Sequence, residues 1–217
     1  MNKLPDLKVR CSLIPQPEYL SEDWYSEQDL IEAIKGISTE NTKMQIGDAI
    51  HKAIEDPERI QNGPFYVRDS ALDLCKRLHA RYAETGGFER RAETYLGEHL
   101  GYKIFLPGHA DVLALGDHGM YGIDWKIVDA SVGEDKYLRY HKSAQGFAYM
   151  EAFDVDEWRF VFLQANVLEN EITALKYVGF TPQYRSLQTK AKVLESCAKI
   201  VDFANFHGLT EHLHRNK

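Results

Sequence analysis

Two apolar runs joined by a short glycine-flanked loop most strongly constrain the fold of this chain. The first run covers residues 108–115 and the second covers residues 121–128, and Gly116 and Gly119 bound the loop between them. Apolar runs of this length joined by a glycine-containing turn are typical of a β-hairpin. We therefore predict two antiparallel strands over residues 108–128.

Charged residues interrupt the predicted hairpin, with Asp111 in the first strand and Asp124 and Lys126 in the second. Side chains two positions apart on a strand leave the same face, so Asp124 and Lys126 point to one side and Trp125 to the other. The pairing of the strands should bring Asp111 close to them. A charge in an apolar strand is costly unless it is paired or binds a metal. The group is thus either a structural Asp–Lys pair or a divalent-metal site with a lysine directed at a phosphate or a water.

Length and composition fit one intracellular globular domain. The 217 residues suffice for one sizeable core, and the net charge of −7 argues against a protein that coats polyanions. It does not exclude an enzyme with a local basic groove. No apolar run approaches the ~18 residues of a membrane span. The three cysteines form no CxxC pair, so we expect neither a disulfide framework nor a zinc or iron–sulfur site.

Hydrophobic periodicity predicts the other elements. Helices are predicted over residues 26–34, 41–55, 70–84, 136–153 and 182–206, and further strands over residues 8–14, 91–96, 102–106, 158–167 and 172–180. Gly97 is predicted to turn the chain, and Pro182 to open the last helix. We expect one domain, with an N-terminal arm and helix (1–40), a core (41–180) and a C-terminal helix (181–217).

A histidine and a glutamate outside the hairpin are candidates for the same site. His51 lies just beside the apolar stripe of the 41–55 helix, so packing of that stripe on the sheet would hold His51 over the sheet edge. Gly47, one turn earlier, would leave room for a close approach. The alternative is a partly buried surface histidine. Glu93 is either a further ligand of a metal or water, or an outward-facing charge.

Four cationic residues are candidates for phosphate contacts: Arg77, Arg81, Arg139 and Lys142. The first two share the exposed side of the 70–84 helix and form either a phosphate-binding groove or a solvated helix face. The other two lie near Gln145 and Tyr149, which share one face of the 136–153 helix because they are four residues apart.

Four short motifs resemble, in order, those of the PD-(D/E)XK nuclease superfamily and of its RecB-like branch. They are Gly47-x-x-x-His51, Gly108-x-x-Asp111, Asp124-Trp125-Lys126 and Gln145-x-x-x-Tyr149. Residues 46–58 and 140–149, with the strand at 160–163, are most similar to RecE-like (exonuclease VIII) and phage recombination exonucleases. The resemblance covers roughly residues 44–165. It implies an α/β fold with a restriction-endonuclease-like core, a central mixed sheet flanked by helices.

The resemblance also implies a role for each motif residue. The ligands of one or two Mg²⁺ or Mn²⁺ ions would be His51, Asp111, Asp124 and the backbone carbonyl of Trp125. Lys126 would polarise or orient the attacking water. Gln145 and Tyr149 would support the site and position the DNA strand. The expected catalytic residues are therefore Asp111, Asp124, Lys126, Gln145 and Tyr149.

Two residues depart from the superfamily pattern. Ala110 precedes Asp111 where the superfamily name has proline, and Asp124 stands where many members have glutamate, although both acids can bind a metal. The cysteines that hold an iron–sulfur cluster in Cas4-like relatives are missing, so no such cluster is expected.

The function implied by the resemblance is a metal-dependent deoxyribonuclease. The main expectation is a 5′-to-3′ exonuclease on linear duplex DNA, acting in phage-type recombination or repair in the cytoplasm of a bacterial cell or phage-infected host. Expected partners are DNA, a single-strand annealing protein and further copies in a ring, with no membrane. The alternatives are a single-strand or structure-specific nuclease, and an inactive nuclease fold that only binds DNA.

Overall fold

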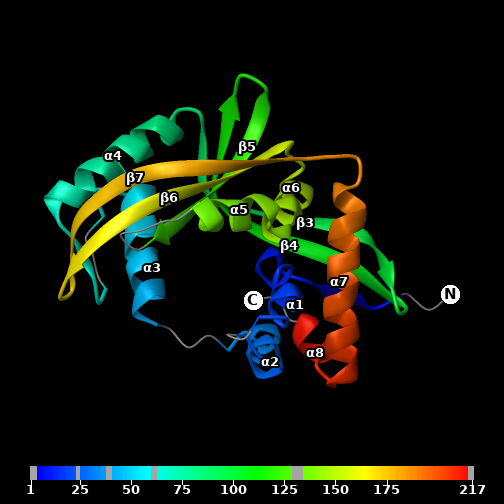
Figure 1. Ribbon diagram of the computed structural model, residues 1–217. Helices are drawn as coiled ribbons and strands as arrows, with labels where there is room; N and C mark the ends of the chain where they lie inside the picture. Colours follow the sequence, from blue (N-terminus) through cyan, green and yellow to red (C-terminus); the bar gives the residue numbers. More distant parts are fainter. Residues whose placement is uncertain (1–3, 23–24, 38–40, 60–62, 129–133, 215–217) are drawn as a thin grey trace.

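The computed structural model describes residues 4–22, 25–37, 41–59, 63–128 and 134–214. The strands are β1 (Asp6–Lys8), β2 (Tyr66–Val67), β3 (Gly86–His99), β4 (Tyr102–Gly116), β5 (Gly119–Val128), β6 (Glu157–Leu168) and β7 (Glu171–Tyr184). The helices are η1 (Cys11–Leu13), α1 (Gln16–Tyr19), α2 (Glu27–Lys35), α3 (Thr42–Glu55), α4 (Asp69–Ala83), α5 (Glu134–Lys142), α6 (Ala144–Phe153), α7 (Thr189–Phe206) and α8 (Thr210–Leu213). They flank a seven-stranded sheet (Figure 1), so the expected α/β fold with a mixed central sheet is confirmed. None of the described helices combines the length and apolar character needed to span a membrane.

The sheet opens beside β4, and this opening positions the candidate site. The strand order is β1-β4-β5-β6-β7-β2, and β3 pairs with β4. Because β3 follows one side of β4 along most of its length, β1 and β5 share the other side. There β1 pairs with residues 103–105 and β5 pairs from Val112 onward. The stretch of β4 between these two pairings ends at Asp111.

Two hydrophobic cores lie on the two faces of the sheet. Alternate residues of β6 supply them, as a strand buried on both faces requires: Phe160 and Phe162 enter one core, and Val161 and Leu163 the other. The first core contains α2, α6 and α7, and the second contains α3 and α4 (Figure 1).

Gly122 of β5 allows Trp158 to pack in the centre of the first core. An added Cβ at residue 122 would lie 1.9 Å from Cζ3 of the fully buried Trp158 ring. We expect Gly122→Ala to lower the free energy of unfolding by about 1–3 kcal/mol, because the ring cannot move within a packed core. Urea unfolding measures this, with Gly63→Ala, where a Cβ meets nothing within 4 Å, as the control. Equal midpoints for the two variants would contradict the prediction.

Several predicted elements are confirmed. Ser26 caps α2 by accepting a hydrogen bond from the Asp29 N–H, and Gly36 ends that helix in the left-handed region at φ 69°. The helices predicted at 41–55 and 70–84 are α3 and α4. The hairpin is formed by β4 and β5, with its turn at Gly116 and Gly119.

The strand predictions around β3 and β4 were wrong in extent. Gly97 does not turn the chain but lies within β3, at an irregularity in the register. The turn falls at Leu100 and Gly101, which both have positive φ. The strand predicted at 102–106 and the first hairpin strand are one continuous strand, β4. The strand predicted at 8–14 is short and ends at Lys8, where the 3₁₀ turn η1 follows.

Two helix predictions were also wrong. Pro182 pairs with Arg159 inside β7, and α7 begins only at Thr189. Proline is tolerated there because the other side of β7 pairs with β2 only at residues 171–172, so this part is an open sheet edge. The helix predicted at 136–153 is broken at Ser143, whose extended backbone and side chain cap α6.

Candidate active site

Asp111 joins three elements where the sheet opens. It directly precedes the Val112–Ile123 pair of β4 and β5. Its Oδ2 accepts a hydrogen bond from the Trp125 N–H at 2.7 Å, and its Oδ1 lies 3.4 Å from Nδ1 of His51 on α3. Burial raises the pKa of Asp111, but His51 and the Trp125 N–H lower it more, so the pKa lies below its usual value. Asp111 is therefore held as a carboxylate.

The main chain of Trp125 presents a carbonyl to the same opening. Its N–H lies past the last pair with β4 and bonds to Asp111 instead. The N–H and C=O of one strand residue point to the same side of the strand, so the Trp125 carbonyl also faces the opening. The indole enters the second core and meets Tyr82 edge-on at 5.7 Å, on the face opposite Asp124 and Lys126 as predicted.

Asp124 and Lys126 form a nearly buried ion pair. Lys126 Nζ lies 2.9 Å from Asp124 Oδ2, and the two side chains are 21% and 10% exposed. The ammonium lies 5.6 Å from the ring centres of Tyr140 and Phe160. Burial and the charge of Asp111 raise the pKa of Asp124 despite Lys126. Burial lowers the pKa of Lys126, but Asp124, Tyr140 and Asp111 together raise it above its ordinary value. Because its pKa is raised, the ionised form of Asp124 would be stabilised further by another positive charge beside it.

His51 reaches the opening from α3, which was one of the two interpretations of the helical pattern. Burial lowers its pKa, but the charge and hydrogen bond of Asp111 raise it to a net value above the ordinary one. The steric role expected for Gly47 is wrong, because an added Cβ would lie 3.8 Å from Ile127, an ordinary contact. Of the two motif glycines, Gly108 is the one whose position leaves no room for a side chain, because an added Cβ would lie 2.9 Å from Ala152.

Gln145 and Tyr149 lie on α6 at the same opening. Gln145 Nε2 donates to the Tyr149 hydroxyl at 3.4 Å. The Tyr149 ring stacks on Trp158 with centroids 4.4 Å apart. Burial, with Asp124 nearby, raises the pKa of the Tyr149 phenol well above its ordinary value. The break between α5 and α6 is stabilised by Gln183, whose side-chain amide donates to the backbone carbonyls of Tyr140, His141 and Ser143.

One acidic residue near the opening, Glu89, was not predicted from the sequence, and the candidate Glu93 pairs with a lysine. Glu89 lies opposite Asp111, between the Phe88–Val112 and Arg90–Ala110 pairs. It bonds to His109 at 2.5 Å, and burial together with the charge of Asp111 raises its pKa. Glu93 instead pairs with Lys8 at 2.7 Å. The predicted strand began at residue 91, so Glu89 lay outside it and no sequence pattern placed Glu89 opposite Asp111.

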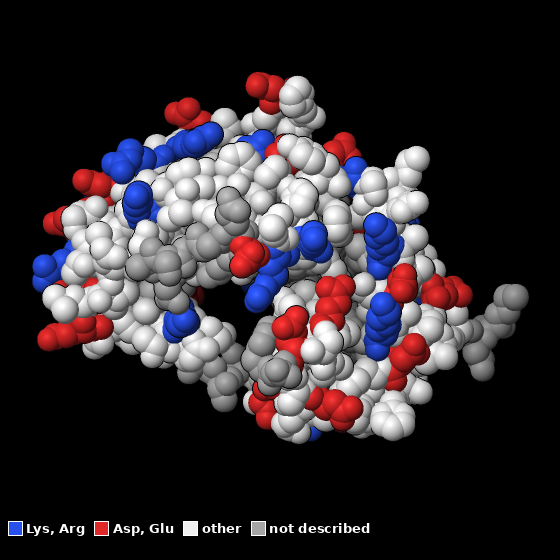
Figure 2. Space-filling model, in the orientation of Figure 1, with Lys and Arg blue, Asp and Glu red and all other residues white. Residues whose placement is uncertain are grey.

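The four candidate phosphate contacts lie on two helices. Arg77 and Arg81 are exposed on α4, which packs in the second core, and Arg81 lies 5.4 Å over the Tyr82 ring. Arg139 and Lys142 are exposed on α5, which carries Tyr140 beside Lys126. On the face shown in Figure 2, acidic and basic side chains are interspersed, and the surface is hollowed between α3 and α2.

The donors at the opening match a hard divalent cation in chemistry. Two carboxylates and a backbone carbonyl are ligands that Mg²⁺ prefers, and an imidazole suits Mn²⁺. Across the described ranges, no three histidine, cysteine, aspartate or glutamate side chains are grouped closely enough to hold an ion as they stand. Asp124 and Asp111 contact Lys126 and His51 instead. The site fits a cation in donor type, and a bound cation would replace Lys126 and His51 as the partner of these carboxylates.

Comparisons with known proteins reveal a shared fold. No protein-family model and no curated protein matches the chain. Among solved structures, SSO0001 matches with a TM-score of 0.52 and 14% identity, over 93% of this chain and 78% of that one. The alkaline exonuclease LHK-Exo of Laribacter hongkongensis (TM-score 0.43, 14% identity, 93% and 91% coverage) is more distant in structure. So is a phage-related exonuclease of Haemophilus somnus 129PT (TM-score 0.45, 14% identity, 94% and 96% coverage). At these identities, the match to SSO0001 shows that the two chains share a fold.

Proposed function

We propose that this chain is a metal-dependent deoxyribonuclease of the PD-(D/E)XK type, closest to the RecE-like exonucleases. The observation that carries the proposal is the meeting of Asp111, Asp124 and Lys126 where β4 and β5 separate. His51 and Tyr149 reach the same place from α3 and α6. Residues of all four sequence motifs thus surround one opening, although each motif alone is a weak signal.

The chemistry of phosphodiester hydrolysis suits these groups. The reaction needs a deprotonated water and compensation for the negative charge that develops on the phosphate. A bound Mg²⁺ or Mn²⁺ lowers the pKa of its water and compensates this charge. In our proposal Asp111, Asp124, His51 and the Trp125 carbonyl hold the ion. Lys126, kept in place by the Tyr140 and Phe160 rings, orients the attacking water and faces the phosphate.

The substrate proposed is the end of a linear DNA duplex, degraded from 5′ to 3′. This choice rests on the similarity of residues 46–58 and 140–149 to RecE-like exonucleases. Ring assembly and a single-strand annealing partner are part of the same proposal. The intact Asp124–Lys126 pair favours an active enzyme over a fold that only binds DNA.

A substrate panel tests the proposal directly. We expect end-labelled linear duplex to be degraded from its 5′ ends with Mg²⁺ or Mn²⁺, and covalently closed circles to survive. EDTA should abolish degradation, because the deprotonated water and the charge compensation both depend on the ion. Cleavage of circles would show an endonuclease, and degradation of single strands alone would show the single-strand alternative. No cleavage of any substrate would contradict the enzyme.

A further inference from the structure

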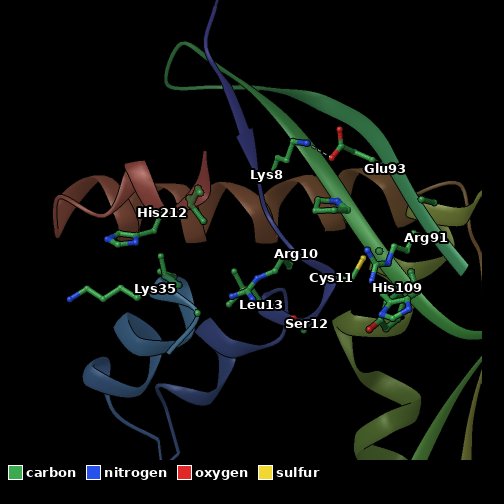
Figure 3. Close-up of a pocket in the computed structure, with 17 residues that line it drawn as sticks. Lys8, Arg10, Cys11, Ser12, Leu13, Lys35, Arg91, Glu93, His109 and His212 are labelled. Carbon is green, nitrogen blue, oxygen red and sulfur yellow. Dashed lines mark ion pairs between the residues drawn. The ribbon is translucent and has the colours of Figure 1, made fainter. Parts of the chain in front are cut away.

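A cavity of about 650 Å³ lies next to the candidate active site, and of the motif residues only Gly108 and Tyr149 are among those that line it. Figure 3 shows Arg91 and His109 at one end, Arg10 in the middle, and Lys35 and His212 at the other end. These residues come from β3, β4, the segment after β1, α2 and α8. The N-terminal arm, to which the motifs assign no role, therefore supplies one wall of the cavity.

One end of the cavity is continuous with the carboxylate site. His109 precedes Asp111 by two positions on β4, so both side chains leave the same side of the strand. Glu89 bonds to His109, and its pKa responds to the charges of Asp111 and His51. Tyr149 lines the cavity and also bonds to Gln145. A chain molecule bound at Asp111 could extend into the cavity at this end.

The cavity carries more positive charge than its surroundings compensate. Its only acidic lining residue is Glu93, which pairs with Lys8. In the part of the chain that the structure describes, Arg10, Lys35 and Arg91 form no ion pair with a carboxylate. In a protein of net charge −7, such a local group of cations in one cavity favours the binding of an anion there.

Among the described residues, Arg10 is the cavity cation whose geometry best suits an oxyanion. Its half-buried guanidinium donates one hydrogen bond, from Nη2 to the Ala33 carbonyl at 2.6 Å, at the C-terminal end of α2. A helix C-terminus carries only about half an elementary charge. The other N–H groups of the fork are suited to bidentate binding of an oxyanion. Burial lowers the pKa of Arg10, as expected for a charge that lacks an anionic partner.

We propose that this cavity binds consecutive phosphates of one nucleic-acid strand, on one side of the bond that is cleaved. The proposal rests on the nuclease function proposed above. The cations lie in a row along the cavity (Figure 3) and do not surround a single point, which suits a strand segment with more than one phosphate. A basic groove that follows the backbone is the usual way to hold a single strand. The N-terminal arm thus contributes a strand-binding surface.

The test is salt-dependent binding of a labelled single-stranded oligodeoxynucleotide in EDTA, where cleavage is blocked. Each phosphate contact that is lost should reduce the slope of log affinity against log salt by about 0.7. We expect this reduction for Lys35→Ala and again for Arg91→Ala, and a larger one for the double variant. Lys192→Ala, which removes an exposed lysine of α7 outside the cavity, should keep the wild-type slope.

Slopes of both cavity variants equal to the wild-type slope would overturn the proposal. Oligodeoxynucleotides with and without a 5′- or 3′-terminal phosphate separate two sources of the anion. If the variants weaken binding only when a terminal phosphate is present, the cavity holds one end group and the strand-segment proposal is wrong. Cleavage of linear duplex by the wild-type chain with Mg²⁺ is measured in parallel. A wild-type chain that does not cleave, with slopes that fall in Lys35→Ala and Arg91→Ala, would fail the catalytic proposal alone. Wild-type cleavage with unchanged variant slopes would fail this proposal alone.

Discussion

Lys126→Ala is expected to slow DNA cleavage by a factor of about 10²–10³, the usual loss when one preorganised donor to the developing charge is removed. The ammonium lies 2.9 Å from Asp124 in a nearly buried position, where charge is little screened by water. No other lysine or arginine lies in the described hairpin strand β5 to replace it. Single-turnover cleavage of linear duplex DNA at saturating enzyme measures the loss.

A matched lysine makes this result specific. Lys52 also pairs with an aspartate, Asp48, at 2.6 Å, but both side chains are more than half exposed on α3. Lys52→Ala should change the rate less than twofold, because exposed ion pairs contribute little. Lys126→Arg should recover part of the activity by keeping the charge. Full activity of a folded Lys126→Ala variant, verified by its melting curve, would remove Lys126 from the mechanism.

The sequence predicted the centre of the site because that part depends on local patterns. Strand alternation places Asp124 and Lys126 on one face and Trp125 on the other, and the structure confirms this arrangement. The turn of the hairpin fixes which residues of β4 and β5 face each other, and so brings Asp111 next to Trp125. Helical periodicity likewise placed His51 beside the apolar stripe of α3, from which it could reach the sheet edge, although it left a surface histidine as the alternative.

The parts that could not be predicted depend on long-range pairing. Glu89 meets Asp111 only because β3 starts at Gly86 and runs antiparallel to β4, which no local pattern indicates. The break at Ser143 depends on Gln183, forty residues later, whose amide binds the carbonyls at the corner. The cavity brings together Arg10, Lys35 and Arg91 from three separate elements. Each of them alone reads as an ordinary surface charge.

Asp111→Asn is expected to abolish stabilisation of the folded protein by Mn²⁺ and to reduce cleavage at least as strongly as Lys126→Ala. An ion that binds only the folded state at a hundred times its dissociation constant stabilises the protein by about 2.7 kcal/mol. For a chain of this size, that corresponds to a rise of roughly 5–10 °C in melting temperature. Asparagine keeps an oxygen for the Trp125 N–H but loses the charge that holds both His51 and the ion. Melting curves with and without Mn²⁺ measure the difference without any need for activity.

Two further Glu→Gln variants show whether the loss of the Mn²⁺-induced shift in melting temperature is specific to this site or follows the removal of any acidic residue. Glu93→Gln should keep the full Mn²⁺ shift, because Glu93 pairs with Lys8 away from the opening. Glu89→Gln should reduce the shift only partly, since its carboxylate lies opposite Asp111 but bonds to His109. A full shift in Asp111→Asn would mean that Mn²⁺ binds elsewhere on the chain. In that case Asp111 would only connect α3 to the opening between β4 and β5, through its contacts with His51 and the Trp125 N–H. The carboxylate site would then be a structural ion-pair network.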